Sequence, residues 1–210
     1  MVSVGIRRLQ MAALLATIMG CSGRLPALKP PKFDPVAAAR AALEQYDTNQ
    51  DGILRGAELE NSPGIRFSLD RIDTNRDGGA TEDEISEMIQ AKWLDPGDGV
   101  MRVKCIVTLN RQPLDGATIT FEPEQFLGGL IHSARGETRA GFATMSVAKE
   151  HLPHANARGV APGLYLVRIS KTVNGTELIP ARYNTETTLG VEVAARASYM
   201  PGAVHFNLRK

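Results

Sequence analysis

The spacing of apolar residues along the chain changes near residue 100. Before that point apolar residues recur every three or four positions, as in Ile65, Leu69 and Ile72, which places them on one face of a helix. Beyond it, apolar and polar residues alternate over 101–109, a pattern typical of a strand with one buried face. We therefore expect a helical first part and an all-β second part.

Three helix starts are marked by capping residues. Asp34 and Ser62 each precede a proline, which favours the first position of a helix. Thr81 and Glu84 have the spacing of a capping box, and the helix that follows would place Ile85, Met88, Ile89 and Trp93 on one face. The turn-forming run DPGDG at 95–99 ends this helix and marks the predicted domain boundary.

Beyond the boundary, short alternating segments are separated by Gly-containing turns. The turns include Asp115-Gly116, Pro162-Gly163 and Asn174-Gly175. Six or seven short strands with such turns predict a β-sandwich with Greek-key crossings. The alternating segments are 101–109, 117–121, 143–147, 165–169, 189–193 and 204–208.

A twelve-residue pattern that occurs twice is the strongest chemical signal. It reads DTNQDGILRGAE from Asp47 and DTNRDGGATEDE from Asp73. Each copy has oxygen-bearing side chains at its first, third, fifth and twelfth positions, a glycine where the chain must turn, and a main-chain carbonyl at the seventh. Calcium takes roughly six to eight such oxygens. We therefore expect two Ca²⁺ sites, one formed by Asp47, Asn49, Asp51, Ile53 and Glu58 and the other by Asp73, Asn75, Asp77, Gly79 and Glu84.

These two loops resemble those of the EF-hand family, and the likeness covers about residues 34–94. Their short separation is similar to that of compact EF-hand pairs in exported bacterial proteins. Two features depart from the family: Ala80 replaces a branched residue at the eighth position, and Arg55 and Arg76 add positive charge. We expect modest affinity and a structural role for calcium. The alternative is a pair of polar turns that cap helices without metal.

The N-terminus has the pattern of a bacterial export signal. Arg7 and Arg8 precede a short apolar stretch over 11–19, and Ile18-Met19-Gly20-Cys21 resembles a lipobox, whose cysteine is lipidated. We expect a signal peptide over 1–20 and a proline-rich tether over 21–33, anchored to a membrane through lipid on Cys21. An ordinary secretory signal and an uncleaved anchor are the alternatives.

The segment after the boundary resembles the carboxypeptidase regulatory-like, or transthyretin-like, β-sandwich family. The likeness rests on GVMRVKCIVTLNRQPLDGATITFEP and APGLYLVRIS, which specify turns and core positions. The predicted fold class is therefore multidomain, α plus all-β, with a compact EF-hand pair over 34–95 followed by a Greek-key β-sandwich over 100–210.

No catalytic constellation is evident in the sequence. Nucleophile-elbow, phosphate-loop and zinc-protease patterns do not occur. Cys105 alternates with polar residues and is expected in the core. Glu150 and His151 with His154 could bind a metal, and the alternative is that they lie in a solvated loop. A catalytic triad around His132 and Ser133 has no recognisable acidic partner.

The charge balance narrows the class of partner. With 24 basic and 23 acidic residues the net charge is +1, so no nucleic-acid footprint is predicted. We expect a non-enzymatic, calcium-binding exported lipoprotein at the periplasm or cell surface, with a structural or binding role. The alternative is an adhesion module whose β-sandwich surface contacts a glycan or an envelope protein.

Overall fold

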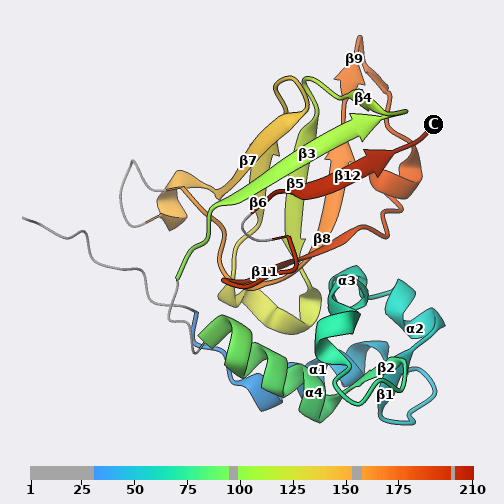
Figure 1. Cartoon of the computed structure of the whole chain (residues 1–210), viewed down its shortest axis with the longest axis vertical. Coiled ribbons are helices and arrows are strands. Elements are labelled where there is room, and N and C mark those ends of the chain that lie inside the picture. Colours follow the sequence, from blue (N-terminus) through green and yellow to red (C-terminus); the bar gives the residue numbers. More distant parts are fainter. Residues whose placement is uncertain (1–30, 95–98, 153–157, 200–201) are drawn as a thin grey trace, which may run out of the picture.

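The computed structural model describes residues 31–94, 99–152, 158–199 and 202–210. A helical segment lies against one end of a curled β-sheet (Figure 1). Predictions for the signal peptide, for most of the tether and for Cys21 fall outside the described residues. In the described part of the chain no helix is long and apolar enough to cross a membrane.

The helical segment contains four α-helices and two short strands. Asp34 caps the first helix, accepting hydrogen bonds from the amides of Val36 and Ala37 at 3.1 Å each. The predicted capping box of Thr81 and Glu84 is also formed. In order the elements are α1 (Pro35–Tyr46), β1 (Ile53–Arg55), α2 (Ala57–Glu60), α3 (Pro63–Ile72), β2 (Gly79–Thr81), α4 (Glu82–Met88) and the π-helix η1 (Ile89–Leu94).

The β part forms one eight-stranded sheet with the order β11-β8-β5-β6-β7-β3-β12, in which β4 also pairs with β3. Neighbouring strands are antiparallel except β12, which runs parallel to β3. A separate hairpin joins β9 to β10. The strands are β3 (Val103–Leu109), β4 (Gln112–Pro113), β5 (Thr118–Pro123), β6 (Ala134–Glu137), β7 (Phe142–Val147), β8 (Gly163–Ser170), β9 (Thr172–Val173), β10 (Thr176–Glu177), β11 (Gly190–Val193) and β12 (Val204–Leu208).

In the described residues of the β part there are also three short 3₁₀ helices: η2 (Gln125–Leu130), η3 (Lys149–His151) and η4 (Ala181–Tyr183). The alternating residues of the strands form the interior of the sheet, as predicted. Cys105 belongs to this core and is fully buried, and burial raises the pKa of its thiol to about 12.

The predicted fold class is wrong. The β part is not a Greek-key sandwich of two sheets, because β6 pairs with both β5 and β7 and makes the sheet continuous. Alternation predicts only that each strand has one buried face. A single curled sheet can bury that face on its own inside, so alternation does not distinguish it from a sandwich of two sheets.

The compact EF-hand pair ahead of a sandwich is also not formed. The helix after the first loop, α2, has only four residues, and α3 packs on β11 and β8 of the sheet (Figure 1). Both family resemblances are therefore corrected to a β-rich fold with short helices. The predicted division between 34–95 and 100–210 stays a prediction, and residues 95–98 lie outside the described ranges.

A buried ion pair holds α3 on the sheet. Glu192 of β11 is 1% exposed, pairs with Arg71 of α3 and accepts a hydrogen bond of 3.3 Å from the indole N–H of Trp93. Burial raises the pKa of Glu192, and the charge of Arg71 opposes that rise. All four residues of β11 are buried, because the helical segment covers the face that alternation assigns to solvent.

A second buried carboxylate joins the two parts near η2. Glu124 is 4% exposed and accepts hydrogen bonds from the Tyr46 hydroxyl at 2.9 Å and from the Gly64 amide at 2.7 Å. Burial raises the pKa of Glu124, while these hydrogen bonds partly offset the rise. Both ends of α3 are thus tied to the β part by acidic side chains.

Candidate functional site

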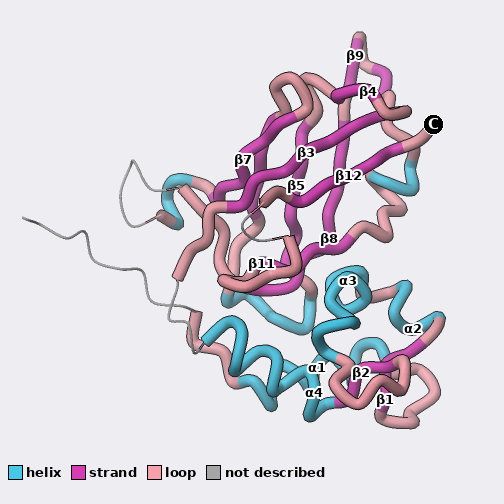
Figure 2. The backbone as a smooth tube through the Cα atoms, in the orientation of Figure 1, coloured by secondary structure: helices cyan, strands magenta, loops and turns pink. Residues whose placement is uncertain are grey.

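The two predicted calcium loops lie side by side at the end of the helical segment that faces away from the sheet (Figure 2). Strands β1 and β2 join them as an antiparallel pair in which Leu54 is opposite Ala80. Both side chains are fully buried, so the eighth positions of the two loops meet in the core despite their difference in size. The pair makes the loops one structural unit.

In the first loop the predicted ligand side chains turn inward and accept hydrogen bonds from the loop's own amides. Asp47 accepts from the Asp51 amide at 3.3 Å and from Gly52 at 2.8 Å. Asn49 Oδ1 accepts from the Asp51 amide at 2.8 Å, and Asp51 accepts from Ile53 at 3.0 Å. Oxygen atoms from these three side chains therefore converge inside the loop.

The second loop repeats this network residue for residue. Asp73 accepts from the Asp77 amide at 3.1 Å and from Gly78 at 2.9 Å. Asn75 Oδ1 accepts from the Asp77 amide at 2.8 Å, and Asp77 accepts from Gly79 at 3.0 Å. The repetition shows that the sequence pattern encodes one loop conformation used twice.

The glycine at the sixth position of each loop is required by the backbone. Gly52 and Gly78 have φ of 81° and 87°, values that a residue with a Cβ atom adopts only with strain. The fourth residues, Gln50 and Arg76, are also left-handed, with φ of 59° and 63°. This tight turn brings the first and fifth ligand positions together.

The glutamates at the twelfth positions close the loops. Glu58 is buried and accepts from the Thr48 amide at 2.9 Å, the Thr48 hydroxyl at 3.0 Å and the Arg55 amide at 3.3 Å. Burial alone would raise its pKa, but these hydrogen bonds leave the pKa lowered. Glu84 makes the matching contacts with Thr74 and Thr81, and its pKa is lowered in the same way. Both carboxylates are held in the charged form.

The donor set fits a hard cation. Each loop offers aspartate, asparagine amide, aspartate and glutamate oxygens together with a main-chain carbonyl at Ile53 or Gly79, which are the ligand types that calcium prefers. Among the described residues, no three His, Cys, Asp or Glu side chains are gathered as a metal-binding cluster. A cation in these loops would therefore depend on amide and main-chain oxygens as well as carboxylates.

Arg55 is placed to compete with a bound cation. Its guanidinium lies 2.5 Å from Asp51 Oδ2, and this hydrogen bond, followed by the charges of Asp51, Asp77 and Glu58, raises the pKa of Arg55. A positive charge this close opposes a second one. We expect Arg55→Gln to raise calcium affinity by about tenfold, mainly in the first loop.

The measurement is a calorimetric calcium titration of the Arg55→Gln protein. Arg196→Gln is the matched control, because Arg196 is an exposed arginine of the β part and its loss should leave both sites unchanged. Equal affinity in wild type and Arg55→Gln would show that the guanidinium does not compete.

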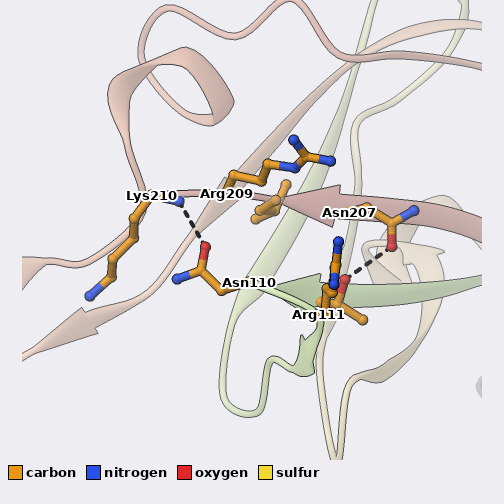
Figure 3. A pocket seen from close by; sticks show the side chains of 7 residues that line it. Asn110, Arg111, Asn207, Arg209 and Lys210 are labelled. Atoms are coloured by element: carbon orange, nitrogen blue, oxygen red, sulfur yellow. Dashed lines mark hydrogen bonds between the residues drawn. The ribbon is translucent and has the colours of Figure 1, made fainter.

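Within the described ranges, the other predicted chemical groups are not gathered into a metal-binding cluster. His132 and His151 stack on each other, with ring centroids 3.6 Å apart, and His154 lies outside the described residues. A hollow at the ends of β3 and β12 (Figure 3) is lined by Asn110, Arg111, Asn207 and Arg209 among others, and no carboxylate side chain lines it. There Asn110 Oδ1 accepts from the Lys210 amide at 3.1 Å.

Glu124 and Glu192, which position the loop-bearing helices, are missing from the sequence prediction. Each is an acidic residue in or beside an apolar strand, a pattern that equally indicates an exposed position. No known family model, curated protein sequence or solved structure matches this chain. Its function is therefore inferred from the residues themselves.

Proposed function

We propose that the protein binds two calcium ions, one in each of the loops 47–58 and 73–84, and that the ions have a structural, non-catalytic role. The observation that carries the proposal is the matching set of hydrogen bonds from the loop amides to inward side-chain oxygens in two loops paired through β1 and β2. Bound calcium would lie among the inward-turned side-chain oxygens of each loop, next to Glu58 or Glu84, whose pKa values are lowered.

The short helix after the first loop, α2, favours a structural role for calcium over a calcium-driven conformational switch. A calcium sensor opens a pair of helices and exposes an apolar groove. Here α2 has four residues, and α3 is tied to the sheet through Arg71 and Gly64. Neither helix is free to swing, so calcium is expected to neutralise the crowded carboxylates of the loops.

Replacing one carboxylate per loop tests the proposal. Glu58→Gln and Glu84→Gln should each remove one site from a calorimetric titration, since each deletes a charged ligand but keeps the size of the side chain. We expect wild-type dissociation constants of about 10⁻⁵–10⁻³ M and at least about a tenfold loss at the altered site. Glu186→Gln, at an exposed position of the β part, is the control. No heat change and no competition at millimolar calcium would refute the proposal.

The proposed setting is the cell envelope. The export signal and lipid attachment at Cys21 stay predictions from sequence, because residues 1–30 lie outside the described ranges. The second candidate, adhesion through the β part, is favoured by one specific surface of the sheet.

A further inference from the structure

A concave basic surface lies on the outer face of β3, β7 and β6. Two hollows of about 920 and 540 Å³ adjoin there, since Arg135, Ser146 and Arg158 line both. The outward residues of these strands, such as Lys104 and Thr144, are exposed, whereas Val103 and Met145 beside them are buried. The surface is thus the solvent face of the sheet.

This surface is strongly positive, whereas the whole chain has nearly equal numbers of basic and acidic residues. Among the residues that the structure describes, six cations and one acid, Glu137, line the two hollows. No ion pair involving any of the six occurs in the part of the chain that the structure describes. Like charges gathered in a hollow repel one another and concentrate anions. The six are Arg102, Lys104, Arg135, Arg139, Lys149 and Arg158.

Hydroxyl groups alternate with the cations across the strands. Arg135 lies opposite Thr120 of β5 and opposite Ser146 of β7, and Lys104 of β3 lies opposite Thr144 of β7. Directly opposed residues in a sheet are near neighbours on one face. The surface therefore offers hydrogen-bonding groups between its positive charges.

One exposed aromatic ring lies at the edge of this surface. Phe142 is 62% exposed and faces Ile106 across the strands. A tight turn with left-handed residues at Ala140 and Gly141 pairs Phe142 with Arg139, so the ring lies beside a cation. An exposed ring of this size has an energetic cost in water, which a ligand with an apolar face would offset.

We propose that this surface binds a linear acidic glycan, a chain of sugars that carry carboxylate or sulfate groups. The cations would pair with the acidic groups, the hydroxyls of Thr120 and Thr144 with sugar hydroxyls, and Phe142 with the apolar face of one ring. A hollow suits a single chain better than a flat membrane, and a single-stranded nucleic acid would call for several stacking aromatics. The proposal is independent of calcium binding.

Titration with defined oligosaccharides tests it on the full chain. A heparin octasaccharide and a galacturonic acid octamer carry sulfate and carboxylate respectively, and maltoheptaose is the neutral probe. We expect at least one acidic probe to bind about tenfold or more tightly than maltoheptaose, with affinity that falls as salt is raised. The tighter of the two identifies the acidic group. Equal binding of maltoheptaose, or tighter binding of single-stranded DNA or of anionic vesicles, would overturn the proposal.

Two matched double variants localise the site. Arg102→Gln combined with Arg135→Gln should weaken binding of the acidic oligosaccharide by about tenfold. Arg111→Asn combined with Arg196→Gln removes the same amount of charge elsewhere and should change this affinity little. Phe142→Ser should weaken the oligosaccharide but not inorganic polyphosphate, which has no apolar face. Equal losses in the two double variants, or an unchanged oligosaccharide affinity in Phe142→Ser, would contradict the assignment.

Discussion

Glu192→Ala should destabilise the protein by about 3–5 kcal/mol, because it leaves the largely buried charge of Arg71 without its counter-ion. Arg71 is 18% exposed in its side chain, and Trp93 would lose the acceptor of its indole N–H. For a chain of this length the melting midpoint should fall by roughly 10 °C. Thermal unfolding followed by the fluorescence of Trp93, the single tryptophan, measures it.

The partly exposed ion pair of Glu122 with Arg168 is the matched control. Its side chains are 39% and 33% exposed, so Glu122→Ala should cost less than about 1 kcal/mol. Replacing both buried partners, by Arg71→Met with Glu192→Leu, should recover most of the loss, since no unpaired charge remains. A cost of Glu192→Ala no larger than that of Glu122→Ala would show that this pair does not hold the helical segment on the sheet.

Gly190→Ala should cost about 3 kcal/mol or more through overpacking. A Cβ atom at Gly190 would lie 1.9 Å from the carbonyl oxygen of Pro63 and 2.7 Å from the amide nitrogen of Gly64. Both are backbone atoms at the start of α3, so the helix would have to move away from β11. Urea unfolding of the variant gives the change in the free energy of unfolding.

Gly129→Ala is the control for this glycine. It has a φ of −84°, and an added Cβ would meet nothing within 4 Å, so its stability should stay within about 0.5 kcal/mol of wild type. Wild-type stability in Gly190→Ala would mean that α3 does not lie this close to β11.

Local structure could be read from the sequence where it depends on neighbouring residues. Asp34 and the Thr81 capping box start helices where predicted, because capping is an interaction within one turn. Alternation located the long strands for the same reason. The strand β6 was not predicted. Only Ala134 among its four residues is buried, so the segment lacks the alternation of apolar and polar residues that indicates a strand.

The topology could not be read in the same way, because it depends on contacts between distant residues. Burial of Glu192 follows from α3 covering β11, and Glu124 is buried by α1 and α3. Each acid has its partners more than 50 positions away in sequence. In contrast, the predicted ligand pattern of each loop lies within twelve consecutive residues, so it can be recognised from the sequence alone.

The thermal midpoint of the whole chain, with and without calcium, tests the central claim most directly. With free calcium about tenfold to a hundredfold above the dissociation constant, each site should add roughly 1.4–2.7 kcal/mol. We predict a higher midpoint in calcium than in chelator, a smaller effect of magnesium, and no increase in hydrophobic-dye binding. The same midpoint in millimolar calcium and in chelator would contradict the claim that these loops are calcium sites that stabilise the fold.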